Sequence, residues 1–206
     1  DWACRHLPLR GKTSRRARVL DIGCGAGLAS EALAKAGYDV LGLDASADGI
    51  AAARRHVDEH PLPQGSGPLN YRVGSAEELV AEHQRFDAVV ALEIIEHVTD
   101  PEAFFCMLSD LVEPNGVVIV STLNRTLRSL AIGKIGAEYV MRLLPVGTHE
   151  WRKFIRPAEL AHYARAAGLR MEAMTGMAPT TLLPLSSPWK ETRDLGVNYI
   201  AAFRKA

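Results

Sequence analysis

A glycine-rich turn between an apolar strand and a helix constrains this sequence more than any other feature. Residues 19–27 read VLDIGCGAG, which places Gly23, Gly25 and Gly27 directly after a short apolar run. Glycine lets the backbone turn sharply and lets a ligand approach the main chain, and the following helix points unpaired amides at that ligand. A second apolar run ends at Asp44, where a carboxylate is placed to accept hydrogen bonds from ribose hydroxyls. The sequence therefore predicts a site for a cofactor that contains a nucleoside.

The spacing of the glycines separates the classes of nucleotide site. A dinucleotide site requires G-x-G-x-x-G, and its third glycine would fall on Leu28. No Lys-Ser or Lys-Thr pair follows the turn, which argues against a phosphate-binding P-loop. The acidic Asp21 at the strand end suits a cationic amino-acid group better than a pyrophosphate. With Asp44, this pattern resembles the class I S-adenosylmethionine-dependent methyltransferases.

The composition limits the class of protein further. A chain of 206 residues suits one α/β domain with a sizeable core. Lys and Arg number 24, as do Asp and Glu, so bulk charge predicts no nucleic-acid partner. Three cysteines without a C-x-x-C motif favour reduced thiols in the cytoplasm. No segment has the length of a transmembrane helix or the pattern of a signal peptide.

Strand and helix patterns alternate along the chain, which predicts a mostly parallel sheet with helices on both faces. Strands are expected at residues 19–21, 40–43, 70–73, 87–92, 116–122, 170–173 and 197–204. Helices are expected at residues 28–36, 48–60, 75–81, 101–111 and 157–167. We therefore expect one domain over residues 1–206 with seven strands, an insertion at about 124–149, and a flexible strap over 179–188.

An acidic cluster follows the fourth expected strand. Glu93, Glu96 and His97 lie within five residues of one another at the carboxyl edge of the sheet, where open α/β sheets bind their ligands. Oxygen ligands with one imidazole suit Mg²⁺, Mn²⁺ or Zn²⁺, and a bound cation lowers the pKa of a substrate hydroxyl. The alternative is that Glu96 and His97 cap the next helix while Glu93 stays solvated.

Later motifs make the resemblance more specific. They are ALEIIEHV at 91–98, STLNRT at 121–126, GAEY at 136–139, PVGTHEW at 145–151, KFIRPAEL at 153–160 and VNY at 197–199. Together they resemble the ubiquinone-biosynthesis O-methyltransferases over nearly the whole chain.

This resemblance implies the Rossmann-like class I methyltransferase fold and methylation of a catechol-type hydroxyl on a polyprenylated ring. The implied substrates are 3-demethylubiquinol and 2-polyprenyl-6-hydroxyphenol. It also implies S-adenosyl-L-methionine contacts at Gly23, Asp44 and Leu92, and a divalent cation, with Mg²⁺ the first expectation, at Glu93, Glu96 and His97. A further cofactor-contacting arginine of the family would lie upstream of Asp1.

The reaction needs in-line proximity and a deprotonated phenol. His97 does not serve easily as both ligand and base, so His149, beside Trp151, is the expected general base, and Glu93 is the second expected catalytic residue. A surface histidine in a loop is the alternative interpretation of His149. Asp21, Gly25 and Gly27 are also expected to contact the cofactor, because they belong to the glycine turn and the strand end before it.

The insertion predicts a further partner. Residues 127–144 are mostly apolar. The charged residues in and beside this segment are mainly basic, with a single acid, Glu138, against Arg125, Arg128, Lys134 and Arg142. Such a segment suits an anionic membrane surface or a lid over the site. We therefore expect a cytoplasmic protein, peripheral at the inner membrane face or on the matrix side in mitochondria, and a partner in a ubiquinone-biosynthesis complex. The competing functions are a methyltransferase for another small molecule and a non-catalytic cofactor-binding module.

Overall fold

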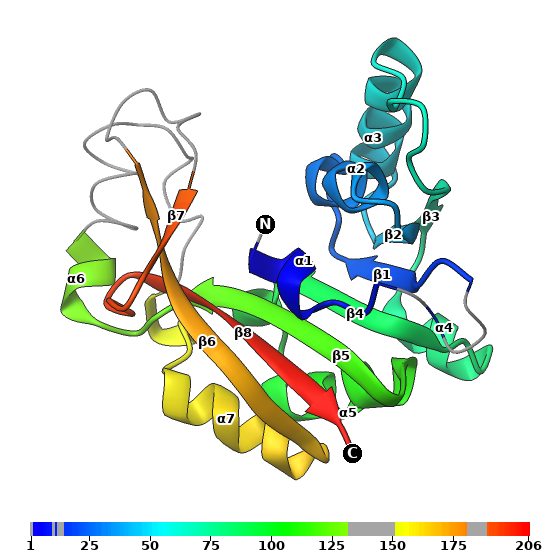
Figure 1. Ribbon diagram of the computed structural model, residues 1–206. Helices are drawn as coiled ribbons and strands as arrows, with labels where there is room; N and C mark the ends of the chain where they lie inside the picture. Colours follow the sequence, from blue (N-terminus) through cyan, green and yellow to red (C-terminus); the bar gives the residue numbers. More distant parts are fainter. Residues whose placement is uncertain (1, 10, 12–14, 132–150, 181–188) are drawn as a thin grey trace.

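The computed structural model describes residues 2–9, 11, 15–131, 151–180 and 189–206. Within these ranges the chain forms one twisted sheet of eight strands in the order β3-β2-β1-β4-β5-β8-β6-β7 (Figure 1). The strands are β1 (Arg18–Ile22), β2 (Asp39–Asp44), β3 (Leu69–Val73), β4 (Phe86–Leu92), β5 (Val112–Leu123), β6 (Leu169–Pro179), β7 (Trp189–Thr192) and β8 (Asn198–Lys205). The first five are mutually parallel, and β8 runs antiparallel between β5 and β6.

Helices connect the strands and cover both faces of the sheet (Figure 1). They are α1 (Trp2–His6), α2 (Leu28–Lys35), α3 (Ala47–Glu59), α4 (Ala76–Ala81), α5 (Pro101–Leu111), α6 (Leu127–Ser129) and α7 (Pro157–Ala166), with 3-10 turns η1 (Ile95–His97) and η3 (Trp151–Lys153). The local sequence explains where several of these helices begin. Ser46, Ser75 and Asp100 accept bonds from first-turn amides of α3, α4 and α5. Pro157 occupies the first turn of α7.

The core divides into two apolar layers, one on each face of the sheet. Helices α4, α5 and α7 pack on one face, where Phe105 meets Phe203 edge to face with centroids 5.7 Å apart. Helices α1 and α2 pack on the other face, over Val19, Val90 and Ile119. Alternate residues of each strand enter opposite layers, so the side chain at each strand end is directed to a defined face.

The predicted fold class is confirmed, with one difference in the strand count. Seven strands were expected, and the eighth is the short edge strand β7, which pairs antiparallel with β6. That strand follows the segment expected to be a strap, of which residues 181–188 lie outside the described ranges. The terminal helix α1 was not predicted either, because its five residues carry too little periodicity to recognise.

Much of the predicted insertion lies outside the described residues. Its first part forms α6, whose start is capped by Thr126. Residues 132–150 are not described, and they include His149, Lys134 and Arg142. Among the helices that are described, none is long and apolar enough to cross a membrane.

Candidate active site

The strand order reverses direction between β1 and β4, since β2 and β3 lie on one side of β1 and β5 lies beyond β4. In open α/β sheets a ligand binds at the carboxyl ends of the strands at such a reversal. The glycine turn follows β1, Asp44 ends β2, and Leu92 and Glu93 stand at the end of β4. The topology therefore brings the predicted cofactor residues to one edge.

The turn after β1 is fastened to the end of β2 by backbone and carboxylate bonds. The N–H of Gly23 donates to the Leu43 carbonyl at 2.8 Å, and the N–H of Gly25 donates to Asp44 Oδ2 at 2.8 Å. The other carboxylate oxygen, Asp44 Oδ1, accepts a bond from the Ser46 N–H at 2.8 Å. The Asp44 carboxylate thus fixes the turn and the start of α3 at the same time.

The turn also leaves room for a ligand. All three of its glycines adopt positive φ, at 71°, 51° and 83° for Gly23, Gly25 and Gly27, a region that favours glycine. A Cβ added to Gly25 would meet nothing within 4 Å. Because a carboxylate offers about four lone-pair positions, Asp44 can still accept hydroxyl donors beside this open space. These residues fit an adenosine-containing cofactor.

Asp21 lies beneath the turn in a nearly closed environment. The residue is 2% exposed, and its Oδ2 accepts a bond from Ser30 Oγ at 2.6 Å. Burial, with the nearby charge of Asp44, raises the pKa of Asp21 to about 6, against the bond from Ser30. Near neutral pH the protein therefore keeps a buried negative charge close to the turn.

Tyr71 supports the turn from β3, a role that the sequence motifs did not predict. Its hydroxyl donates to the Gly27 carbonyl at 3.2 Å, and burial raises its pKa. Tyr71 pairs with Gly42 in the parallel register, where a Cβ on Gly42 would lie 2.6 Å from the ring. A glycine inside an otherwise apolar strand signals a close approach, so Gly42 was the available clue.

Cys24 lies between two of the glycines and is inert in this setting. Burial, with the neighbouring charges of Asp21 and Asp44, raises the pKa of the Cys24 thiol to about 12. The thiol therefore remains protonated and is a poor nucleophile.

The end of β4 carries an unusual backbone conformation. Glu93 has φ 53°, a left-handed value that is uncommon for a residue other than glycine. Its N–H donates to Ser121 Oγ at 3.1 Å, and its Oε1 accepts from the same hydroxyl at 2.6 Å. Glu93 is exposed as a whole residue, whereas protein atoms largely surround its carboxyl group. Burial and the neighbouring Glu96 charge raise the pKa of Glu93. A strained backbone that is fixed by neighbouring bonds is a frequent mark of a functional site.

The three predicted metal ligands have different surroundings. Glu96 is 4% exposed, and its Oε2 accepts from Thr122 Oγ1 at 2.8 Å. Glu93 instead bonds to Ser121, whose side chain enters the opposite layer of the sheet from Thr122. His97 is exposed. In the part of the chain that the structure describes, no group of three His, Cys, Asp or Glu residues is arranged to hold a metal ion. The residues as arranged here do not fit the predicted three-ligand site.

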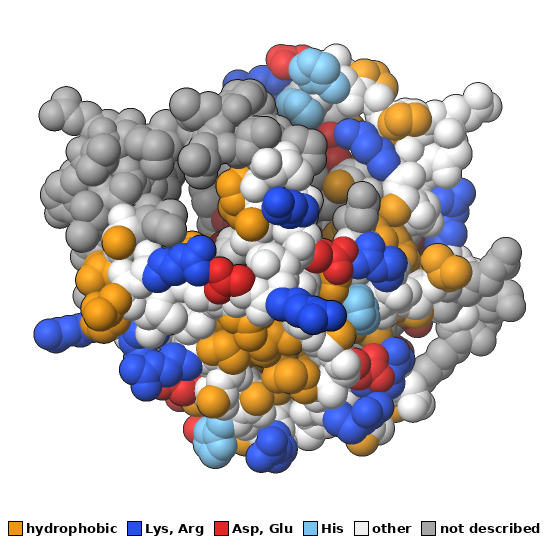
Figure 2. Space-filling model, turned by 60° about the vertical axis from the view of Figure 1, so that its left-hand side comes forward, with side chains coloured by type: hydrophobic (Ala, Val, Ile, Leu, Met, Phe, Trp, Pro, Cys, Tyr) orange, Lys and Arg blue, Asp and Glu red, His pale blue; other side chains and the backbone are white. Residues whose placement is uncertain are grey.

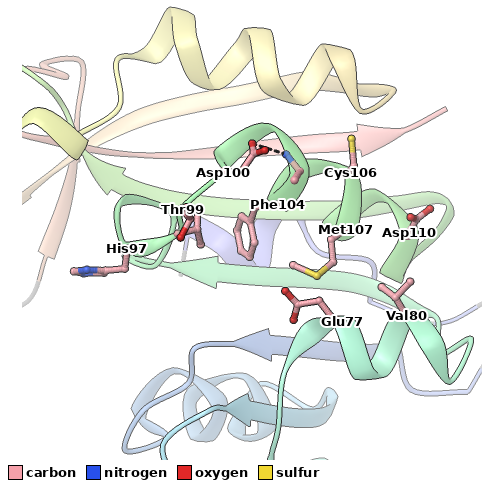
Figure 3. A pocket seen from close by; sticks show the side chains of 11 residues that line it. Glu77, Val80, His97, Thr99, Asp100, Phe104, Cys106, Met107 and Asp110 are labelled. Atoms are coloured by element: carbon pink, nitrogen blue, oxygen red, sulfur yellow. Dashed lines mark hydrogen bonds between the residues drawn. The ribbon is translucent and has the colours of Figure 1, made fainter.

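His97 lines a groove between α4 and α5 (Figure 3). The groove has a volume of about 830 Å³, and Val80, Phe104 and Met107 form much of its apolar wall. Figure 3 shows the imidazole of His97 at one end, directed away from Phe104 and Met107. Neither the glycine turn nor Asp44 borders this groove. The groove is therefore separate from the edge that fits the cofactor.

Comparisons with known proteins agree with the class that this fold and site define. A family model described as a methyltransferase domain matches residues 2–174. Two solved methyltransferases share the fold. Magnesium protoporphyrin IX methyltransferase from Synechocystis, solved with bound S-adenosylhomocysteine, has a TM-score of 0.67 at 21% identity and covers 100% of this chain and 78% of its own. A methyltransferase from Methanosarcina mazei has a TM-score of 0.70 at 17% identity, and the match covers 99% of this chain and 96% of the Methanosarcina chain. The protein is an S-adenosylmethionine-dependent methyltransferase.

Curated relatives narrow the family. A ubiquinone biosynthesis O-methyltransferase from Azorhizobium caulinodans is 46% identical over 97% of this chain and 74% of its own length. One of the same description from Thiobacillus denitrificans is 42% identical over 99% of this chain and 83% of its own. The chain belongs to the ubiquinone biosynthesis O-methyltransferase family, as the sequence motifs predicted.

Alanine should affect mainly ligand binding at Gly25 and mainly stability at Gly27. Gly25→Ala adds a methyl group to open space, so it should fold with a penalty of about 1–2 kcal/mol for the left-handed backbone. It should weaken S-adenosylhomocysteine binding, because the methyl group takes ligand space. Gly27→Ala would place its Cβ 2.2 Å from the Tyr71 hydroxyl and should lower the unfolding midpoint much further. Calorimetric titration beside thermal unfolding checks this; equal affinity in Gly25→Ala and wild type would contradict it.

The buried charge of Asp21 predicts a pH-dependent stability difference. The native pKa of about 6 exceeds the ordinary 3.8, so the unfolded chain ionises first and stability falls as pH rises between these values. Above pH 6 the loss is complete, at roughly 3 kcal/mol from about 1.4 kcal/mol per unit. Asp21→Asn, without cofactor, should match wild type below pH 4 and exceed it above pH 6. Urea unfolding across this range checks the sign; a difference that does not change with pH would contradict it.

Proposed function

We propose that this protein transfers a methyl group from S-adenosylmethionine to a catechol-type hydroxyl of a polyprenylated ring in ubiquinone biosynthesis. The observation that carries the proposal is the 42–46% identity to curated relatives named for that reaction, together with a cofactor-shaped edge next to Glu93. The cofactor supplies an electrophilic methyl group on a sulfonium. The protein has to bind the cofactor, orient the phenol in line, and remove the hydroxyl proton.

Cofactor binding is assigned to the edge formed by β1, β2 and β4. Asp44 would accept the ribose hydroxyls, and Gly23, Gly25 and Gly27 would allow the backbone to approach the ligand. Asp21 would place its buried charge near the amino-acid group of the cofactor. Leu92, half-buried at the end of β4, would contact the apolar face of the ligand.

Proton removal is assigned to Glu93 among the described residues. Glu93 is an exposed residue at the catalytic edge, and Ser121 orients its partly buried carboxylate through the 2.6 Å bond. Glu93 would take the proton of the reacting hydroxyl, and the phenolate oxygen so formed would accept the methyl group that the bound cofactor supplies. His149, the base predicted from the sequence, lies outside the described residues and stays a prediction.

The divalent cation also stays a prediction, and no step above passes through it. Glu93 and Glu96 are neighbours with a mutually unfavourable charge interaction, which a cation would relieve. Their hydroxyl partners and the exposed position of His97 do not assemble a complete ligand set. A chelator therefore decides between a metal-assisted reaction and one that depends on Glu93 alone.

We also propose that α6 contacts an anionic membrane. Leu127 is 77% exposed there, and Arg128 lies beside it. However, Arg128 pairs with Asp194, and Arg125 pairs with Glu159. Figure 2 shows basic side chains interspersed with acidic ones around an apolar patch on one face of the molecule. Apolar insertion would thus contribute more than charge to membrane binding by the described part of this segment. Membership of a biosynthetic complex stays a prediction.

Methyl transfer to a short-tailed prenylated catechol tests the proposal. Wild type should form the methyl ether and S-adenosylhomocysteine in equal amounts. Glu93→Gln should lower kcat by roughly 10²–10⁴-fold, the usual contribution of a general base, with S-adenosylhomocysteine affinity unchanged. Labelled-methyl transfer resolved by chromatography provides the measurement.

Two arms of the same assay separate the alternatives. Cofactor binding without transfer to the catechol would contradict the proposal and favour another substrate or a non-catalytic module. A chelated enzyme that loses activity and regains it with Mg²⁺ would support the cation, whereas full activity after chelation would contradict that part alone.

A further inference from the structure

One buried amide in the described part of the chain has no hydrogen-bond partner. Asn198, the first residue of β8, is 8% exposed, and its Oδ1 is fully buried without a donor. No other buried side-chain oxygen or nitrogen within the described ranges is left in this way. Buried polar groups are satisfied in the great majority of cases, so an orphan acceptor calls for an explanation such as a ligand.

The sheet register places this amide near the proposed catalytic base. Asn198 pairs with Leu123, and Ile200 pairs with Ser121, in the antiparallel ladder of β5 and β8. Ile200 enters the apolar layer under α1 and α2, and Tyr199 enters the other. By alternation, Asn198 lies on the same face as Ser121, the residue that holds Glu93. The orphan acceptor and the base therefore share one face of one sheet edge.

The backbone around the amide is well fastened. Asn124 N–H donates to the Val197 carbonyl at 2.8 Å, and Asn124 Nδ2 donates to the Leu195 carbonyl at 2.8 Å. Thr126 Oγ1 donates to the Gly196 carbonyl at 2.6 Å. The approach to β8 is thus fixed by three bonds, and Asn124 donates two of them. The lack of a partner for Asn198 is therefore not explained by loose packing of the segment around it.

We propose that Asn198 is a substrate-binding residue that accepts a hydrogen bond from the spectator hydroxyl of a catechol, the one next to the hydroxyl that is methylated. This inference rests on the proposed function. A catechol carries two adjacent hydroxyls; one gives up its proton to the base, and the other keeps its proton and remains a donor. A neutral amide oxygen accepts that donor without removing the proton. A site built to bind a hydroxyl rejects the analogue that lacks it.

The test compares Asn198→Leu with the matched variant Asn124→Leu. Leucine has the same branching and the same number of side-chain heavy atoms as asparagine, so Asn198→Leu removes the orphan acceptor without opening a cavity. Its unfolding midpoint should equal or exceed that of wild type, because an unpaired acceptor is lost. Asn124→Leu breaks a formed bond and should lower the midpoint. Both variants should bind S-adenosylhomocysteine as wild type does, since Asp44 and the glycine turn are untouched.

The decisive quantity is a selectivity ratio. It is kcat/KM for the prenylated catechol divided by kcat/KM for the same ring with the spectator hydroxyl replaced by hydrogen. Intrinsic reactivity cancels when this ratio is compared between proteins. Asn198→Leu should reduce the ratio at least tenfold, and Asn124→Leu should leave it within about twofold of wild type.

Each outcome decides the matter. An unchanged selectivity ratio in Asn198→Leu, whatever its unfolding midpoint, would overturn the role of Asn198. Methylation of the catechol by wild type would still uphold the proposed function. A wild type that binds S-adenosylhomocysteine and methylates neither ring would overturn the proposed function and this inference with it.

Discussion

The bond between the Gly25 N–H and the Asp44 carboxylate joins the two halves of the cofactor edge. It connects the turn after β1 to the end of β2 at 2.8 Å, and the same carboxylate holds the start of α3 through Ser46. Bonds from backbone N–H groups to a carboxylate are charge-assisted and stronger than neutral ones. These two bonds fix the open space beside Gly25 before any ligand arrives, so little ordering remains to oppose binding.

Several polar residues of the site are held in energetically unfavourable environments or conformations. Asp21 is held in a nearly closed site with a raised pKa, Glu93 has a left-handed backbone, and the Asn198 amide has no partner among the described residues. Each of these lowers the stability of the free protein. All three lie at or near the carboxyl edge, whereas the two apolar layers behind it are conventionally packed. Such local departures are expected where binding and chemistry take place.

The sequence predicted the sheet because its apolar runs are short and separated by clear helix starts such as Asp100-Pro101 and Arg156-Pro157. It also placed the glycine turn and Asp44 at the ends of two consecutive strands, which the structure brings to one edge. The contacts of these residues with the cofactor stay predictions. The sequence did not predict Tyr71 or Ser121, because each reaches its partner only through strand register. Spacing alone grouped Glu93, Glu96 and His97, but alternation in β5 gives the two carboxylates hydroxyl partners that enter opposite layers.

Calorimetric titration of S-adenosylhomocysteine into wild type and Asp44→Asn tests the central claim most directly. The variant keeps the shape of the side chain and loses its charge. A hydrogen bond to a charged group contributes about 1.5–3 kcal/mol, so the affinity of Asp44→Asn should fall about tenfold or more. Asp39→Asn, at the opposite end of β2, is the control and should bind as wild type does. Equal affinity in folded Asp44→Asn and wild type would contradict the account.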